Sequence, residues 1–389
     1  MIFEMYFFLN LRVQNYKTLR KLNDLYKIAT SKLHGIGPVR TQQLLSKIGD
    51  VEELFSNTLK SIWMHTGFNQ SILKALNREE ALKQAEIQLN FNEKNNVSTH
   101  FFLDSDYPRR LKQCNDAPIV VYSKGNADLN NTKIVSIVGT RDITNYGVRI
   151  LNELIFSLKD EGVLVISGLA YGVDITAHRL CLEHNIPTIG VLGHGFDRIY
   201  PFKHRGTAKE MLENGGLVTE FMINTKPDRE NFPMRNRIVA GMADATIVIE
   251  SKIKGGSIIT AELANDYSRD VFAFPGDIDR PYSEGCNDLI RKQKAHLITN
   301  GMDFLTFMNW NDEKVAHSNQ IQLFQELDFN EMEIVKELQQ ENDLHADILC
   351  VRLNKTPSQI NVLLFNLEMI GVIQQLPGKR FKLLNQVRA

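Results

Sequence analysis

Closely spaced cysteines are missing from this sequence. Its four cysteines, Cys114, Cys181, Cys286 and Cys350, lie far apart and form no Cys-x-x-Cys pair. Zinc sites and disulfide frameworks use paired cysteines, so the pattern argues against both and suits a reducing cytosol. We therefore expect a cytoplasmic protein without a metal site or a bound cofactor.

Long apolar runs and an excess of either charge are missing as well. The apolar start, Met1 to Val13, is interrupted by Glu4, lacks the basic region of a signal peptide and is too short to span a bilayer. We expect no association with a membrane. The 45 basic residues are balanced by 46 acidic ones, so the chain is no general cationic coat for nucleic acid. A polyanion would have to bind at a local patch.

Composition and periodicity divide the 389 residues into five segments. We predict an extension over 1–21, a helical domain over 22–95, a sheet domain over 96–308, a linker over 309–320 and a small domain over 321–389. In the helical domain, Gly35-Ile36-Gly37-Pro38 precedes a helical run from Arg40 to Ile48. This order is typical of a helix-hairpin-helix, whose glycine N–H groups can hold a phosphate. A tight turn in an accessory bundle is the alternative interpretation.

From residue 101 onward, apolar strands alternate with segments of helical length. Strands are predicted near 119–122, 134–138, 163–166, 188–192, 217–221, 245–249 and 271–274, with helices near 147–159, 174–184, 206–214, 234–243 and 257–268. The alternation predicts an α/β fold with a Rossmann-like, doubly wound parallel sheet. Ligands of such a sheet bind at the carboxyl ends of its strands.

The last segment has the pattern of a winged helix. Asn330 with Glu333 suggests a capping box that begins one helix, and a second helix is expected over 344–351. Thr356 and Pro357 predict the start of a third helix through Met369, and a two-stranded wing follows with a turn at Pro377-Gly378.

The sheet domain contains an ordered series of short motifs that resembles the DNA-processing protein A family (DprA, also called Smf). The motifs are Asp106-Tyr107-Pro108, Gly139-Thr140-Arg141, Ser167-Gly168-Leu169-Ala170-Tyr171-Gly172-Val173-Asp174, Gly193-His194-Gly195, Tyr200-Pro201, Arg235-Asn236-Arg237 and Gly255-Gly256-Ser257. The resemblance implies a bacterial, non-catalytic protein that binds single-stranded DNA, protects incoming strands and loads the RecA recombinase during natural transformation. It also implies a homodimer formed through the sheet domain.

Several side chains near the predicted strand ends are candidates for phosphate contacts. Arg141 offers a rigid fork of donors directly after a strand, and glycine turns let a backbone approach an anion. The full set of phosphate-binding candidates is Gly139, Thr140, Arg141, Ser167, Gly168, Lys203, Arg235, Asn236, Arg237, Gly256, Ser257 and Thr260. Tyr200, Phe202 and Phe232 lie among the cations and are candidates for base stacking.

Other residues are assigned to the dimer face or to the interior of the fold. Leu289, Ile290 and Leu297 are candidates for the dimer face, although simple core packing explains them equally well. His178 fits a buried, hydrogen-bonded histidine better than a metal ligand or an acid–base catalyst. His204 stands where the family usually has Asn, and Phe202 where it often has Lys, which leaves the details of the basic pocket open.

Two competing functions are open at this stage. A nucleotide-binding enzyme of the phosphoribohydrolase type could use Glu220, Glu250 or Glu262, but the Pro-Gly-Gly-x-Gly-Thr phosphate loop of those hydrolases is absent. A transcription factor would need a basic recognition helix. The first helices of the last domain are acidic instead, with eight acidic residues and one Lys between Gln320 and Leu349. We therefore favour a protein-contact or regulatory role for that domain.

Overall fold

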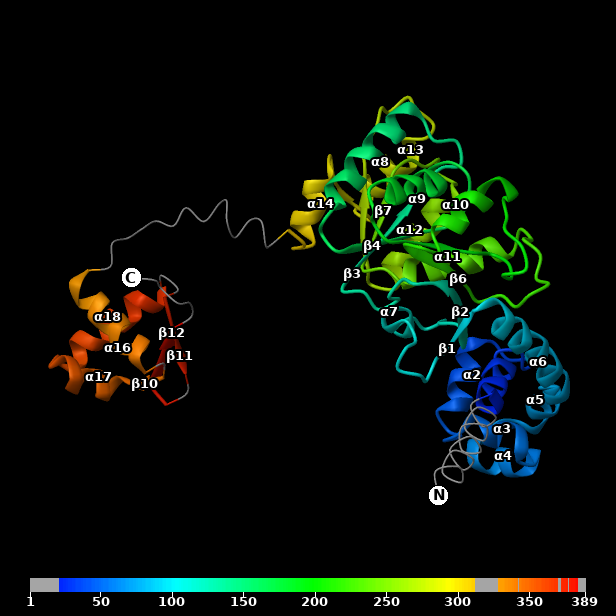
Figure 1. The fold of residues 1–389 in the computed structure, drawn as a ribbon, viewed down its shortest axis with the longest axis horizontal. Helices are drawn as coiled ribbons and strands as arrows, with labels where there is room; N and C mark the ends of the chain where they lie inside the picture. Colours follow the sequence, from blue (N-terminus) through cyan, green and yellow to red (C-terminus); the bar gives the residue numbers. More distant parts are fainter. Residues whose placement is uncertain (1–20, 312–327, 342, 370–371, 377, 384–389) are drawn as a thin grey trace, which may run out of the picture. The chain divides into compact units, whose positions relative to one another are not determined.

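The computed structural model describes residues 21–311, 328–341, 343–369, 372–376 and 378–383. They form two compact units that divide the chain between Asn311 and Asp312 (Figure 1). The predicted extension lies outside the described residues, except for Lys21, and residues 21–30 are helical. No helix among the described residues is long and apolar enough to cross a bilayer.

The first unit is built on a mixed sheet. Among the described residues, its strands follow the order β1-β2-β6-β5-β4-β3-β7-β8-β9. The strands from β6 to β9 in this order are parallel, as predicted, whereas β1 and β2 form an antiparallel edge next to β6. The strands are β1 (Ser98–Phe101), β2 (Val120–Gly125), β3 (Lys133–Val138), β4 (Val163–Ser167), β5 (Thr188–Val191), β6 (Gly215–Thr219), β7 (Ala245–Val248), β8 (Asp270–Ala273) and β9 (His296–Leu297).

Helices cover both faces of this sheet because its central strands are apolar on both sides. In β3, Ile134 and Val138 pack into one core cluster, and Val135 and Ile137 pack into the other. The first cluster joins the sheet to α7 (Arg109–Lys112), α11 (Asn231–Gly241), α12 (Gly256–Asp266) and α13 (Glu284–Arg291). The second joins it to α8 (Asn145–Leu158), α9 (Val173–Glu183) and α14 (Gly301–Phe307), and η1 (Phe202–His204) with α10 (Arg205–Glu210) follows β5.

The N-terminal helices share a core with the antiparallel edge of the sheet. Buried residues between Ile28 and Val97 form one cluster with Phe101, Val120 and Tyr122 of β1 and β2, so helices and sheet belong to one unit (Figure 1). A boundary between residues 95 and 96 therefore stays a prediction. The helices are α2 (Pro38–Leu45), α3 (Val51–Ser56), α4 (Leu59–Thr66), α5 (Gln70–Ala75) and α6 (Arg78–Asn95).

The predicted helix-hairpin-helix turn is present. Gly35 has a φ of +78°, a conformation that glycine adopts without strain. Gly37 is the N-cap of α2 and Pro38 its first residue, in agreement with the sequence pattern.

The predicted linker over 309–320 begins too early. Trp310 is buried and packs edge-on against Phe304 of α14, with 5.3 Å between the ring centroids. Residues 309–311 therefore belong to the first unit, and residues 312–320 lie outside the described part of the chain.

The second unit has the predicted topology of a winged helix. Its three strands follow the order β10-β12-β11 and pack with three helices on one apolar core. The capping box of α16 is formed by Asp328 and Glu331, two residues before the predicted Asn330 and Glu333. The elements are α16 (Phe329–Gln340), β10 (Leu344–His345), α17 (Ala346–Leu353), α18 (Pro357–Met369), β11 (Ile373–Leu376) and β12 (Arg380–Leu383).

Candidate nucleic-acid interface

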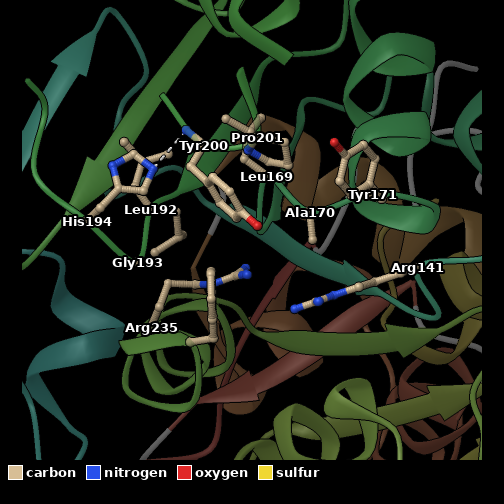
Figure 2. Close-up of a pocket in the computed structure, with 12 residues that line it drawn as sticks. Arg141, Leu169, Ala170, Tyr171, Leu192, Gly193, His194, Tyr200, Pro201 and Arg235 are labelled. Atoms are coloured by element: carbon tan, nitrogen blue, oxygen red, sulfur yellow. Dashed lines mark hydrogen bonds between the residues drawn. The ribbon is translucent and has the colours of Figure 1, made fainter. Parts of the chain in front are cut away.

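A pocket opens at the carboxyl ends of β3, β4 and β5, where a ligand of a doubly wound sheet is expected. Loops after these strands form one part of its wall, and the start of α11 forms the other (Figure 2). The residues that line it are Arg141, Leu169, Ala170, Tyr171, Val191, Leu192, Gly193, His194, Tyr200, Pro201, Phe232 and Arg235. Four of these, Arg141, Tyr200, Phe232 and Arg235, are among the predicted site residues. The pocket therefore brings two of the three candidate arginines together with two candidate stacking rings.

Arg141 is held at the rim by a clamped loop. The N–H of Thr140 donates to the backbone oxygen of Glu250 at 2.8 Å, and the Thr140 oxygen accepts from the N–H of Val173 at 3.1 Å. Gly172 faces this loop with a φ of +74°, and a Cβ there would lie 2.2 Å from the Thr140 oxygen. The Arg141 side chain is exposed and points into the pocket (Figure 2). Among the described residues, no acid forms a salt bridge with it, so its donors remain available to an anion.

Arg235 faces the same pocket from the start of α11, but it is buried. Only 6% of the residue is exposed, and Asp174 Oδ2 lies 3.7 Å from its Nη1. This distance is beyond hydrogen-bond range, and the Arg235 Nε has no partner within the described part of the chain. Burial raises the pKa of Asp174, and Arg235 opposes that shift. The pair is thus an ion pair without a fixed hydrogen bond.

Aromatic rings border the two guanidinium groups. The rings of Tyr200 and Phe232 lie 6.2 Å apart, and the guanidinium carbon of Arg141 lies 5.7 Å from the centre of the Phe232 ring. Tyr171 is 44% exposed and meets the ring of His204 edge-on at 4.8 Å. Rings and cations together suit a nucleic-acid base and its phosphate, because every base can stack and every nucleotide carries a charge.

His194 fixes the loop that carries Tyr200. Its Nε2 accepts from the N–H of Tyr200 at 3.2 Å (Figure 2). Its Nδ1 therefore carries the proton and donates to the Gly195 oxygen at 2.9 Å. Burial lowers the pKa of His194, which favours this neutral form. The sequence motif Gly193-His194-Gly195 was visible in the chain, but nothing in it indicated which nitrogen of His194 would be used.

Several predicted phosphate contacts are wrong because the side chains are used inside the fold. Ser167 is fully buried and donates to the Ile137 oxygen at 2.6 Å. Ser257 donates to Ser251 Oγ at 2.7 Å, and the buried Thr260 hydroxyl faces the Gly256 oxygen at 3.4 Å. Each hydroxyl thus faces a partner inside the fold instead of a ligand.

Arg237 is likewise a structural cation. It donates to the backbone oxygen of Asp116 and to Glu220 Oε2, and 8% of the residue is exposed. The two arginines lie two residues apart on α11 and therefore on different sides of the helix, so that Arg235 lines the pocket and Arg237 does not. The side chain of Asn236 donates to the Gly256 oxygen at 3.4 Å.

The remaining candidates lie outside the pocket lining. They are Gly139, Thr140, Gly168, Lys203, Phe202 and Gly256. Of these, Phe202 and Lys203 are exposed on η1.

The carboxylates proposed for an enzyme do not line the pocket. Glu250 accepts from the Thr144 hydroxyl at 2.6 Å and from the Thr144 N–H at 2.9 Å, which ties down the start of α8. Glu220 is paired with Arg237, and Glu262 forms an exposed salt bridge with Lys294 at 3.2 Å. No group of three or more His, Cys, Asp or Glu placed to hold a metal occurs in the described part of the chain.

His178 has the role that the sequence predicts. It is fully buried; Nε2 lies 2.5 Å from the Gly168 oxygen and Nδ1 2.7 Å from the Thr188 hydroxyl. Burial lowers the pKa of His178 to about 4. The histidine therefore stays neutral at physiological pH and anchors the turn at Gly168 from behind the pocket.

The predicted dimer residues separate into core and surface. Leu289 is 2% exposed and belongs to the core, and Ile290 is half-buried against it, so the prediction is wrong for Leu289. Leu297 is 51% exposed on β9, the last strand of the sheet. Phe307 of α14 is also exposed, and its ring lies 4.3 Å from that of His296 on the same strand.

Two cations beside the recognition helix of the winged helix are already paired. Arg352 bonds to Glu337 at 3.2 Å and to Glu341 at 2.8 Å, and Lys355 bonds to Glu333 at 2.9 Å. Helix α18, in the position of a recognition helix, contains no Lys or Arg. Its exposed side chains include Val362, Phe365 and Met369. Such a surface lacks the positive charge that binding to a DNA backbone requires.

Comparison with known proteins decides the family. The sequence profile described as DNA recombination-mediator protein A matches residues 98–309, and that of the DprA winged helix domain matches residues 325–379. The chain belongs to this family. The helices before residue 98 lie outside both matches.

Individual members of the family are similar over much of their length. Protein Smf of Escherichia coli is 32% identical over 313 residues, which cover 76% of this chain and 83% of that protein. The DNA processing protein DprA of Streptococcus pneumoniae is 40% identical over 204 residues, or 52% of this chain and 71% of that protein.

Two solved structures extend the likeness to the fold. The crystal structure of the S. pneumoniae protein has a TM-score of 0.63 at 31% identity and covers 72% of this chain and 97% of its own. A structure of DNA processing protein A from Helicobacter pylori, described for its single-stranded DNA binding mode, has a TM-score of 0.50 at 29% identity. It covers 55% of this chain and 95% of its own.

Proposed function

We propose that this protein binds single-stranded DNA without regard to sequence, through the pocket at the carboxyl ends of β3 to β5. The observation that carries the proposal is the meeting of Arg141 and Arg235 with the rings of Tyr200 and Phe232 at one rim. Phosphate contacts and stacking read no sequence, because every nucleotide offers both groups. The single-stranded DNA binding named for the H. pylori relative supports the same ligand.

Binding rather than catalysis is the better account of this pocket. Its lining contains no carboxylate, and Asp174 lies behind Arg235 as its counter-ion. A base–ribose hydrolysis would need a carboxylate in reach of the sugar. We therefore expect no release of base when the protein is incubated with nucleoside monophosphates. Turnover that disappears in Glu220→Ala or Glu262→Ala would reject this proposal in favour of an enzyme.

The direct test compares a fluorescent oligo-dT with a duplex of equal length at several salt concentrations. We expect tighter binding of the single strand, because unstacked bases can reach the rings of the pocket and paired bases cannot. Two phosphate contacts predict a slope of log affinity against log salt of about −1.4. Equal affinity for the duplex would contradict the proposal.

The resemblance to the family supports a cellular role as well. We propose that the protein protects incoming strands and loads RecA onto them during natural transformation. The test is RecA filament formation on single-stranded DNA coated with a single-strand-binding protein. Wild-type protein should shorten the lag, and Arg141→Ala should not. A wild-type protein that leaves the lag unchanged would remove the loading role and leave the binding role standing.

We further propose a homodimer that uses the β9 edge of the sheet. The exposed Leu297 and Phe307 at this edge, together with the half-exposed Met302 of α14, support it. Burying such side chains favours association. Leu297→Asp should give a monomer by light scattering, while Ile253→Asp, at an exposed isoleucine outside this edge, should not. A dimeric Leu297→Asp protein would exclude this edge.

A further inference from the structure

We infer that Asp174 and Gly168 are positioning residues that hold Arg235 against the DNA pocket, and that neither of them contacts the DNA. The inference rests on the proposed function and assigns a task to the motif Ser167 to Asp174. Direct phosphate contact is the obvious task for a glycine-rich strand end. The geometry points to the seating of an arginine instead.

Gly168 provides the space that the guanidinium occupies. A Cβ at this position would lie 1.6 Å from Arg235 Nη1, 2.5 Å from its Cζ and 2.3 Å from Asp174 Oδ2. The φ of Gly168 is not in the left-handed region, so its backbone does not demand glycine. The Arg235–Asp174 pair therefore requires that residue 168 have no side chain, whereas the turn itself does not require it.

Asp174 provides the charge that keeps Arg235 in this space. The guanidinium makes no hydrogen bond with the described residues, and its buried Nε has no partner. A buried cation is costly unless an opposite charge lies nearby. Asp174, itself 6% exposed on the first turn of α9, is the acid that lies closest to it, at 3.7 Å.

A second cation on the same rim makes this counter-ion necessary. Arg141 and Arg235 point into one pocket (Figure 2), and like charges repel when they share a site of low dielectric. Without Asp174, Arg235 would turn away from Arg141 toward solvent. With it, the two guanidinium groups can face a single phosphate-bearing strand. The 3.7 Å separation also leaves the Arg235 donors uncommitted to Asp174.

Removing the charge of Asp174 should change the affinity for DNA in the direction opposite to the one expected from charge alone. Asp174→Asn removes one negative charge beside the pocket, which by charge alone should tighten DNA binding. If Asp174 positions Arg235, oligo-dT affinity should instead fall about tenfold, the loss of one charge-assisted contact. Asp142→Asn is the matched control, since Asp142 is exposed next to Arg141 and contacts Tyr282 rather than Arg235. It should bind the oligonucleotide as tightly as wild type or more tightly.

A double-mutant cycle separates positioning from general damage. In an Arg235→Ala background, Asp174→Asn should cause no further loss, because the residue it acts through is gone. Gly168→Ala is the second variant. It displaces the guanidinium without changing any charge and should also weaken binding about tenfold. All affinities are measured at a temperature well below the lowest melting midpoint of the set, so that every variant is folded. If Asp174→Asn does not fold at any usable temperature, Gly168→Ala decides the test.

The outcomes distinguish this inference from the proposed function. If Arg235→Ala weakens binding while Asp174→Asn and Gly168→Ala bind like wild type, the positioning role is overturned and the DNA site stands. If Arg141→Ala and Arg235→Ala both bind like wild type, the pocket is not the DNA site. The proposed function is then rejected, and the positioning role is rejected with it. Additive losses from Asp174→Asn and Arg235→Ala would also overturn the positioning role.

Discussion

Basic side chains at the rim of the sheet and beside the recognition helix of the winged helix differ in their pairing, because those at the rim are open to a ligand while Arg352 and Lys355 are bonded to glutamates. Arg141 has no acidic partner in the described structure, and Arg235 has one at 3.7 Å without a hydrogen bond. In the winged helix, Arg352 is bonded to two glutamates and Lys355 to one. The comparison teaches that the pairing state of a cation, more than its presence, marks a site for polyanions.

The first unit, which contains the sheet, should lose stability in acid. Burial lowers the pKa of His178 to about 4, below its ordinary value near 6.5. Between these values the unfolded chain binds a proton that the folded chain does not. Stability of the first unit should therefore fall by about 3 kcal/mol as the pH drops from 6.5 to 4. His194, whose pKa burial also lowers, acts in the same direction.

Tryptophan fluorescence can isolate this effect. Both tryptophans, Trp63 and Trp310, lie in the first unit, so urea unfolding followed at several pH values reports on it alone. His178→Gln keeps a donor and an acceptor but cannot titrate, and it should flatten most of the pH dependence. An equally steep dependence in His178→Gln would show that other groups are responsible.

Removing the unpaired cation should give the largest loss of DNA binding. Arg141→Ala is expected to weaken oligo-dT binding by about 1.5–3 kcal/mol, the value of a charge-assisted hydrogen bond. It should also reduce the salt slope by about 0.7, because one phosphate contact is lost. Fluorescence anisotropy at several salt concentrations measures both. Arg149→Ala, an exposed arginine on α8 outside the pocket, is the control. An unchanged affinity in a folded Arg141→Ala protein would remove Arg141 from the site.

The stacking rings should contribute somewhat less than Arg141 to the free energy of DNA binding, and their contribution should depend little on the salt concentration. Phe232→Ala should lose about 1 kcal/mol or more, since the ring borders the pocket and faces Arg141. Phe202→Ala is a matched control, because Phe202 is 73% exposed and lies outside the pocket lining. If Phe202→Ala loses more than Phe232→Ala, the strand runs over η1 and the assignment of the stacking surface is wrong.

The sequence predicted backbone features well and side-chain directions less well. Seven of the nine strands described in the first unit, the parallel run of the sheet and the winged helix follow from periodicity and end signals, which depend on local residues. The edge strands β1 and β9 and the antiparallel direction of β2 were not predicted. The motif around Arg141 also pointed to the end of the sheet at which the pocket lies. Ser167, Ser257 and Arg237 were misassigned because a hydroxyl or a guanidinium at a strand end can turn toward the fold as easily as toward a ligand. Which way it turns depends on partners distant in sequence, such as Ile137 for Ser167 and Glu220 for Arg237.

The smallest effect on DNA binding is expected when a paired cation of the winged helix is removed. Lys355→Ala should change oligo-dT and duplex affinity less than twofold, because Glu333 already holds the ammonium group at 2.9 Å. Glu333→Gln removes the partner and leaves the cation free. If the salt bridge to Glu333 is what keeps Lys355 from binding DNA, Glu333→Gln should raise the affinity for duplex slightly at low salt. This gain should be absent from the double variant that carries both Glu333→Gln and Lys355→Ala. A marked loss from Lys355→Ala alone would mean that the winged helix uses a paired cation for DNA, since the phosphate would then have to displace the glutamate. Pairing would in that case be a poor criterion for the sheet rim as well.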